Sequence, residues 1–176
     1  MVIMGIDLGI ARTGIAVSDG GEKFAFPKDV IKEYNTEKLI TKICDKAREY
    51  EAGLIVVGLP KNMDGSLGER AQTCMEIAEK IGDISGIETV LYDERCTTME
   101  AYNLLDMNDT YGKKRKEAVD AVAATVILED YLTYRKNRKL FDAQKETLDT
   151  FLSTKAISKE QYDKSLNGLK EKMNIK

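Results

Sequence analysis

The first nineteen residues read Met1-Val-Ile-Met-Gly-Ile-Asp7-Leu-Gly9-Ile-Ala-Arg12-Thr-Gly14-Ile-Ala-Val-Ser-Asp19. Two apolar runs separated by glycines predict a β-hairpin with Asp7 at its turn. An unpaired carboxylate in a protein core costs free energy, so Asp7 needs a reason to stand beside a buried strand. A metal ion or a phosphate-bearing ligand is one reason. A solvated Asx turn is the other, and the hairpin alone favours neither.

The rest of the chain alternates between strand and helix patterns. Phe24–Ile31 has the composition of a third, irregular strand, and the apolar run Leu54–Gly58 is typical of a buried parallel strand. Spacing predicts helices at Thr36–Ala47, Glu69–Ile81, Thr98–Met107 and Glu117–Tyr134, and a strand at Thr89–Tyr92. A three-strand meander followed by alternating helix and strand predicts a mixed α/β sheet flanked by helices.

Composition excludes several kinds of chemistry. The chain has no histidine, which rules out Ser-His and Cys-His catalysis and the common His-containing zinc sites. Cys44, Cys74 and Cys96 are widely spaced and form no C-x-x-C pair, which favours reduced thiols in a cytoplasmic protein. The net charge of -3 argues against a general nucleic-acid coat protein. It remains compatible with an enzyme that meets phosphates through metal ions.

Length and hydropathy indicate a protein that does not enter a membrane. With 176 residues, 43% of them apolar, one domain with a substantial core is expected. No apolar stretch reaches membrane-spanning length, and Met1 leads straight into the first strand, so no targeting segment is expected.

Three acids stand where ligands bind in such folds. Asp7 and Glu94 follow strands, and Asp120 lies in the first turns of an otherwise apolar helix. Because parallel strands end at one ligand-binding edge, the three could converge there as hard oxygen ligands for Mg²⁺ or Mn²⁺. Two such ions, about 3.5–4 Å apart, would support phosphodiester cleavage without histidine. The alternatives are ion pairs of Asp93 and Glu94 with Arg95 or Arg12, and helix-dipole stabilisation by Asp120.

Basic residues are predicted around the same edge. Arg12, Lys61 and Arg95 could neutralise phosphates, and the run Lys113-Lys114-Arg115-Lys116 is predicted to form a basic loop beside Asp120. A solvated loop without a ligand is the alternative for that run. The segment Pro60–Gly68 is predicted to be a mobile loop over the site, in which Asn62 and Ser66 could bind a phosphate.

Four blocks resemble the motifs of the YqgF/RuvX family, in the family's order and over roughly the first 135 residues. Besides the opening stretch they are Val57-Gly-Leu-Pro-Lys-Asn-Met-Asp-Gly65, Tyr92-Asp-Glu-Arg-Cys-Thr-Thr98 and Val119-Asp-Ala-Val-Ala-Ala-Thr-Val-Ile-Leu128. The resemblance implies an RNase H-like fold related to Holliday-junction resolvases. It also implies a nuclease for 5′-end maturation of pre-16S rRNA, with junction resolution as the alternative. Asp7, Glu94 and Asp120 would be its catalytic, metal-binding triad.

Two features depart from the family pattern. The family often has a Lys-Arg pair after the first glycine, whereas this chain has Ala11-Arg12 and loses one phosphate contact. The chain also continues past the family's usual length. Residues 137–176 carry nine Lys/Arg and six Asp/Glu, and Ser158-Lys-Glu-Gln161 is a capping box. We therefore expect a nuclease domain at 1–136 and a helical hairpin extension at 137–176.

Other functions remain open on sequence alone. The Asp-x-Gly hairpin also resembles the phosphate loop of actin-like ATPases and sugar kinases, which need two such domains around a nucleotide. A non-catalytic RNA-binding or regulatory module of the same fold is the third possibility. The expected partners are structured RNA such as pre-rRNA, or branched DNA. The chain itself is expected to be a monomer or a weak homodimer.

Overall fold

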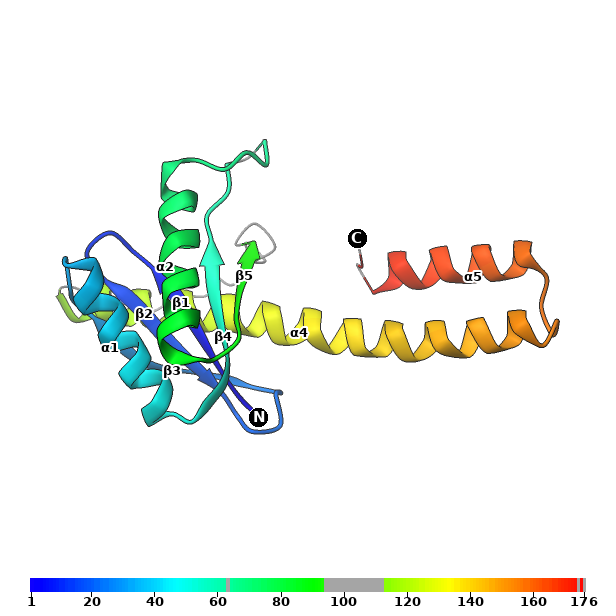
Figure 1. Cartoon of the computed structure of the whole chain (residues 1–176), viewed down its shortest axis with the longest axis horizontal. Helices are drawn as coiled ribbons and strands as arrows, with labels where there is room; N and C mark the ends of the chain where they lie inside the picture. The colour runs from blue at the N-terminus through cyan, green and yellow to red at the C-terminus, as the bar shows by residue number, and fades with distance from the viewer. Residues whose placement is uncertain (63, 94–112, 174, 176) are drawn as a thin grey trace. The chain divides into compact units, whose positions relative to one another are not determined.

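The structure is a computed structural model, described for residues 1–62, 64–93, 113–173 and 175, and for the backbone alone over 113–121. Its elements are shown in Figure 1 and follow the order β1 (Val2–Leu8), β2 (Thr13–Ser18), β3 (Ala25–Ile31), α1 (Thr36–Glu49), β4 (Ala52–Leu59), α2 (Glu69–Ser85), β5 (Thr89–Asp93), α4 (Lys113–Ser153) and α5 (Lys159–Lys172). The predicted helix at Thr98–Met107 lies outside the described residues.

The five described strands form one sheet in the order β3-β2-β1-β4-β5. β1 pairs with β2, and β2 with β3, in antiparallel fashion, while β1-β4 and β4-β5 are parallel. This arrangement confirms the predicted meander joined to parallel strands. Asp7 lies within the β1 ladder opposite Gly14 rather than in the turn itself, which refines the predicted hairpin.

The two faces of the sheet are covered by different helices. Side chains alternate between faces along a strand, and Met4, Ile6 and Leu8 of β1 point into a core shared with α1 and α2. In Figure 1 these helices lie on the near side of the sheet, and α4 passes behind it. The helical predictions for α1 and α2 hold because their apolar positions recur every three or four residues. The buried positions of these helices are Leu39, Ile40, Ile43, Cys44, Ala47, Ala71, Cys74, Ile77, Ala78 and Ile81.

A polar cluster ties β3 to the end of α1. The hydroxyl of Tyr50 donates to the carboxylate of Asp29, and the Nζ atom of Lys46 lies 2.9 Å from the same carboxylate. Burial, together with the hydrogen bond to Asp29, raises the pKa of Tyr50 to about 12. Tyr50 therefore stays protonated and keeps donating across the neutral pH range.

The last helices differ from the prediction. The helix predicted at Glu117–Tyr134 continues to Ser153, and the predicted loop Lys113–Lys116 is its first turn. The segment contains no Gly or Pro, and its Lys, Arg, Glu and Gln residues are good helix formers. The change in charge balance near residue 137 therefore does not interrupt the helical backbone of α4.

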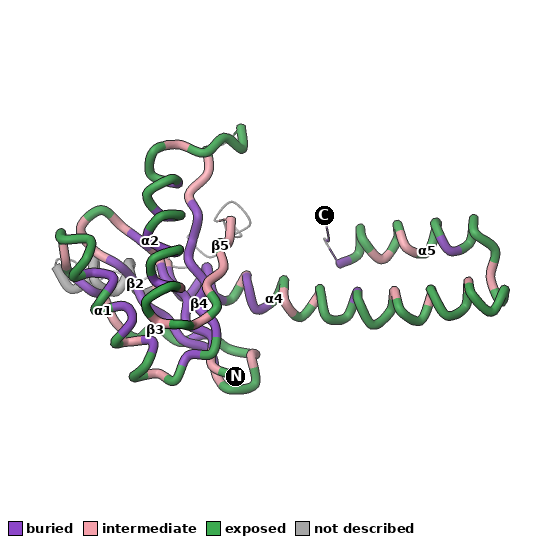
Figure 2. The backbone as a smooth tube through the Cα atoms, viewed as in Figure 1, coloured by how far each residue is buried: buried purple, intermediate pink, exposed green. Residues whose placement is uncertain are grey.

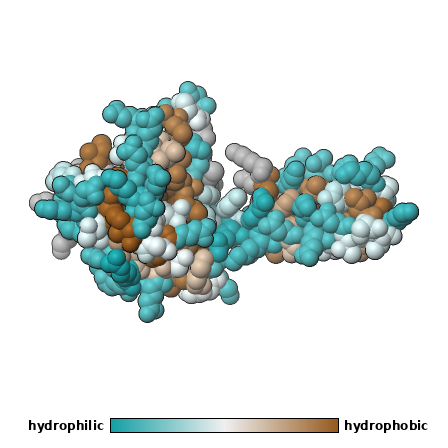
Figure 3. Space-filling model, in the orientation of Figure 1, coloured by the Kyte–Doolittle hydropathy of each residue, from teal (hydrophilic) through white to brown (hydrophobic). Residues whose placement is uncertain are grey.

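The chain divides into two compact units, Met1–Tyr131 and Leu132–Lys176, and the division falls inside α4. In the second unit Phe141, Met173 and Ile175 form a small core, with Leu166 and Leu169 against it. The capping box at Ser158 and Gln161 is present as predicted. Figures 2 and 3 show that most of this unit is exposed and polar, with isolated apolar patches. Independent folding of 1–136 remains a prediction.

In the described part of the chain, no helix combines the length and apolar character needed to cross a membrane.

Candidate active site

The carboxyl ends of three parallel strands meet at one edge of the sheet. Ile6, Val57 and Leu91 stand in one row across β1, β4 and β5, so the residues that follow them share this edge. Asp7 comes next on β1, and its side chain is half-buried. The edge is therefore the place where ligands of α/β sheets bind, and one of the predicted acids lies on it.

Asp7 lies on the face of the sheet that α4 covers. A Cβ atom added at Gly5 would lie 2.8 Å from the Cβ atom of Leu128 and 3.1 Å from the carbonyl oxygen of Ala124. Asp7 shares the face of Gly5 because it follows two residues later on the strand. Asp120 precedes Ala124 by four residues in α4, which is about one helical turn. The helix that carries Asp120 thus crosses β1 on the face of Asp7.

The turn after β1 depends on a glycine. The amide of Gly9 donates to the carbonyl oxygen of Asp7 over 3.2 Å. A Cβ atom at Gly9 would lie 2.4 Å from the carbonyl oxygen of Arg12, a distance that no side chain can adopt. Gly9 therefore lets the chain fold tightly, and it brings half-buried Arg12 back to the edge that carries Asp7.

Asp93 occupies the other face of the same edge. It pairs with Leu59 in the sheet register, and Leu59 belongs to the core beneath α1 and α2. The Nζ atom of Lys61 lies 3.1 Å from its carboxylate, and both side chains are mostly buried. Asp93 therefore forms an ion pair with Lys61. The alternative partner Arg95 lies outside the described residues. The next residue, Glu94, lies outside the described residues.

Arg70 is a candidate that sequence reasoning missed. Its Nη2 atom donates to the carbonyl oxygen of Leu8 over 3.3 Å, which places a guanidinium at the end of β1, one residue after Asp7. In the sequence it resembles any exposed arginine in the first turn of a helix. The available signal was topological, because the helix after β4 must begin at the edge where β4 ends.

The loop between β4 and α2 uses its polar groups internally. The side-chain amide of Asn62 donates to the hydroxyl of Ser66 over 2.8 Å, and the amide of Ser66 donates to Asp64 over 2.8 Å. Asn62 and Ser66, considered as phosphate ligands, thus bind each other in this structure. The mobility of this loop remains a prediction.

The remaining predicted site residues cannot be placed as side chains. Glu94 and Arg95 lie outside the described residues. Asp120 and the run Lys113–Lys116 are described only as backbone of α4. Within the described residues, no group of three or more His, Cys, Asp or Glu side chains could hold a metal ion. The convergence of Asp7, Glu94 and Asp120 remains a prediction.

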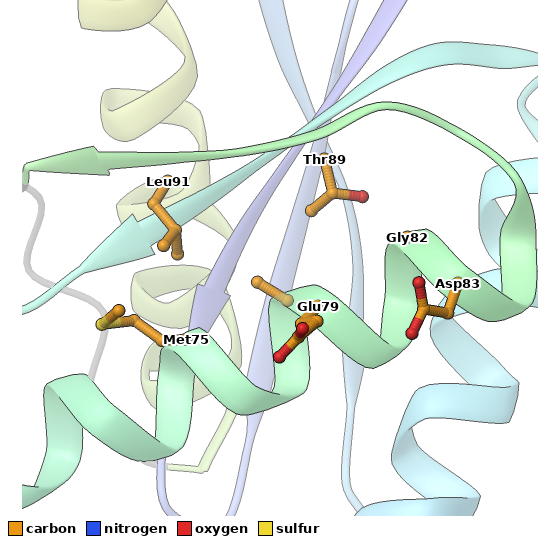
Figure 4. A pocket seen from close by; sticks show the side chains of 7 residues that line it. Met75, Glu79, Gly82, Asp83, Thr89 and Leu91 are labelled. Atoms are coloured by element: carbon orange, nitrogen blue, oxygen red, sulfur yellow. The ribbon is translucent and has the colours of Figure 1, made fainter.

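A hollow on the opposite face is separate from this site. Figure 4 shows it between α2 and β5, where Met75 and Leu91 approach each other and Glu79 and Asp83 line one side. Leu91 points away from the α4 face, because its neighbour Tyr92 packs edge-on against Tyr131 of α4 with ring centroids 5.5 Å apart.

Comparison with known proteins identifies the family. A model of the family described as "RuvX: Holliday junction resolvase" matches residues 1–134. A protein of Thermoanaerobacter pseudethanolicus named "Putative pre-16S rRNA nuclease" is 41% identical over 139 residues, which are 78% of this chain and all of that protein. The chain belongs to the RuvX family. A Bacillus cytotoxicus RuvX relative of the same name is also 41% identical, over 75% of this chain and 98% of its own length.

A solved structure supports the fold of this RuvX protein. Thermus thermophilus RuvC in complex with a Holliday junction substrate superposes with a TM-score of 0.52 at 14% identity, covering 74% of this chain and 94% of that one. The fold is therefore that of the RNase H-like resolvases, as the resemblance implied. The family model ends at residue 134, close to the predicted boundary at residue 136.

Proposed function

We propose that the chain is a metal-dependent nuclease that cleaves phosphodiester bonds in the 5′-end maturation of pre-16S rRNA. One observation carries the proposal. Half-buried Asp7 stands at the shared strand edge, on the face crossed by α4, in a chain about 40% identical to relatives named for this role. A carboxylate at such an edge is placed to meet a ligand.

Asp7, Glu94 and Asp120 would hold the metal ions. The donor set is all carboxylate, which fits Mg²⁺ or Mn²⁺ and not a softer metal. Two such ions, when bound, would supply an activated water and stabilise the leaving oxygen. The chain itself would hold these acids in position, Asp7 from β1 and Asp120 from α4.

Basic groups would hold the sugar-phosphate backbone near these acids. The proposed set is Arg12, Lys61, Arg95, Lys113, Lys114, Arg115 and Lys116. Arg12 reaches the edge through the tight turn at Gly9. Lys61 contributes from the end of β4, where it also pairs with Asp93. We place this activity in the cytoplasm, with the chain acting as a monomer or weak homodimer.

Resolution of four-way DNA junctions is the second candidate. It is favoured by the description of the family model and by the likeness to RuvC in complex with its junction. Both activities hydrolyse a phosphodiester at a branched or structured nucleic acid, so the same acids would serve either substrate. The distinction therefore depends on the substrate-binding surface.

One preparation of the full chain can separate these functions. It would be incubated with 5′-extended 16S precursor RNA and with a four-way DNA junction, in Mg²⁺, in Mn²⁺ and in excess EDTA. We expect metal-dependent cleavage of the RNA, loss of cleavage in Asp7→Asn, and normal cleavage in the control Asp83→Asn on the opposite face. Cleavage of the junction alone would select the second candidate. Tight binding without cleavage of either substrate would indicate a non-catalytic module.

A further inference from the structure

An exposed aromatic ring stands at the same sheet edge as Asp7. Tyr34 is 83% exposed, in the short segment between β3 and α1. Single exposed apolar residues are normal on protein surfaces, so exposure alone carries no meaning. Three further features set Tyr34 apart, namely a fixed backbone, its place at this edge, and the charges around it.

The backbone that carries the ring is held in place. The Oε1 atom of Glu33 accepts hydrogen bonds from the amide of Tyr34 over 3.0 Å and from the amide of Asn35 over 3.1 Å. The other carboxylate oxygen of Glu33 binds Lys42 over 2.8 Å, which anchors this brace to α1. Asn35 in turn caps α1 by accepting from the amide of Lys38. A ring on such a segment is pre-organised for binding, because little backbone freedom is left to lose.

The sheet register places this segment on the catalytic edge. Ile31, the last residue of β3, pairs with Thr13, which pairs with Leu8 at the end of β1. Two strand spacings of about 4.8 Å separate β3 from β1. Tyr34 follows Ile31 by three residues, which span at most about 10 Å. The ring therefore lies within the reach of a few nucleotides, at about 3.4 Å per stacked base, from a phosphate at Asp7.

The charges around the ring favour a polyanion. The nearest acids in the chain are paired with lysines, since Glu33 pairs with Lys42 and Glu37, in the first turn of α1, pairs with Lys80, each over 2.8 Å. Lys32 lies two residues before Tyr34 in the chain and Lys38 four residues after it, and both are exposed. The N-terminus of α1 points the positive end of its dipole to the same place. An aromatic ring set among cations is the arrangement by which proteins hold single-stranded nucleic acid.

We propose that Tyr34 stacks on an unpaired base of the nucleic-acid substrate, a few nucleotides from the phosphodiester held at Asp7. This inference rests on the proposed nuclease function and specifies its substrate. A base within a continuous duplex offers no free face, whereas an unpaired or splayed base does. The enzyme should therefore prefer phosphodiesters that lie a few nucleotides from an unpaired base, as in single-stranded extensions and at branch points.

A binding experiment tests the stacking without requiring cleavage. Full-length Asp7→Asn protein would be titrated with a short single-stranded RNA that contains 2-aminopurine, whose fluorescence is quenched on stacking. Tyr34→Ala in that background should weaken binding about 5- to 100-fold, which corresponds to the loss of one stacked base. It should also abolish the quenching. Tyr34→Phe keeps the ring and should stay within about 2-fold of the parent.

The chain offers a matched control at the other end of the sheet. Phe24 is 64% exposed, and its amide is likewise held by an acid, Asp19, over 2.7 Å. Phe24→Ala should leave binding and quenching unchanged. Equal losses in both alanine variants, or an unchanged affinity in Tyr34→Ala, would overturn the inference. The ring would then be a candidate contact for another kind of partner, such as a protein.

Cleavage by otherwise wild-type chains separates the two proposals. If RNA is cleaved and Tyr34→Ala cleaves an unpaired site as well as wild type does, the stacking inference fails and the nuclease stands. If 2-aminopurine is quenched through Tyr34 but no substrate is cleaved, the nuclease proposal fails and the stacking site stands.

Discussion

The two ends of one β-sheet use their acids in different ways. At the end where β2 turns into β3, the carboxylate of Asp19 accepts hydrogen bonds from the amides of Gly21, Lys23 and Phe24. These hydrogen bonds, of which the one from the amide of Phe24 has the largest effect, lower the pKa of Asp19. The charged carboxylate thus stabilises the turn. At the other end, Asp7 lies inside a strand, half-buried and on the face that α4 crosses. The charge of Asp19 is thus explained by the turn it holds, whereas Asp7 stands on a strand at the edge where ligands of α/β sheets bind.

Exchanging each acid for its amide should separate catalysis from stability, and this is the largest effect we expect. Asp7→Asn should lower the cleavage rate by about 10³-fold or more, since the acids of a metal site act as one unit. Asp19→Asn should keep the rate of the folded enzyme and lower its Tm. Cleavage rates and thermal unfolding of both variants are the measurements. A fully active Asp7→Asn enzyme would remove the distinction between the two ends.

The first turn of α4 should affect binding more than chemistry. Replacing Lys113, Lys114, Arg115 and Lys116 with Gln should flatten the dependence of log K on log salt by about 0.7–0.9 for each residue that touches a phosphate. The measurement is RNA binding by Asp7→Asn protein across a salt series. A slope identical to that of the parent would place the nucleic acid elsewhere on the surface.

Substitution of Arg70 tests whether activity depends on the guanidinium at the end of β1. Arg70→Ala removes the guanidinium from the carbonyl of Leu8 and should lower kcat/KM about 10-fold, because small displacements at a catalytic acid are costly. Arg48 of α1, which pairs with Asp45, is the matched control, and Arg48→Ala should leave kcat/KM unchanged. Equal effects of the two substitutions would show that Arg70 acts only through general charge.

Each end of the sheet also carries an acid that supports stability in a pH-dependent way. Hydrogen bonding to Lys42, with help from backbone amides, lowers the pKa of Glu33 to about 2. A carboxyl with a lowered folded-state pKa stabilises the fold above its unfolded pKa of about 4.3, and this contribution is lost as pH falls toward 2. The Tm of wild type should therefore drop more steeply between pH 5 and pH 2 than the Tm of Glu33→Gln. Asp19→Asn should flatten the curve in the same direction, and parallel curves for all three proteins would contradict this explanation.

The smallest effect is expected from removing the second unit. A chain that ends at Lys136 keeps buried Tyr131 and Leu132 and cuts α4 after them. It should fold cooperatively and show the same contrast between Asp7→Asn and Asp19→Asn. Calorimetry and cleavage of a short RNA check this expectation. Loss of the cooperative transition would show that residues 137–176 belong to the catalytic fold.

The sequence predicted the regular parts of the molecule well. β1, β4, α1 and α2 follow from apolar runs and from helical spacing, and Gly9 follows from the need for a tight turn. The length of α4 was missed because its polarity changes near residue 137 although its helix propensity does not. Arg70 was missed because its contact with the end of β1 depends on the three-dimensional arrangement of α2 and β1, which the sequence pattern does not give. The ion pair of Asp93 with Lys61 was missed because Lys61 lies after another strand, β4, and single-sequence patterns carry no such pairing.

The close approach of α4 to Gly5 makes position 5 a spacer between β1, which carries Asp7, and α4, which carries Asp120. One methyl group there would meet Leu128 at 2.8 Å, and the helix would have to move away from β1. The turn that carries Asp120 belongs to that helix and would be carried along with it. Gly5→Ala would thus change the separation of two acids without altering either one. Selection on this protein should therefore tolerate change at many core positions and forbid even the smallest side chain at this one.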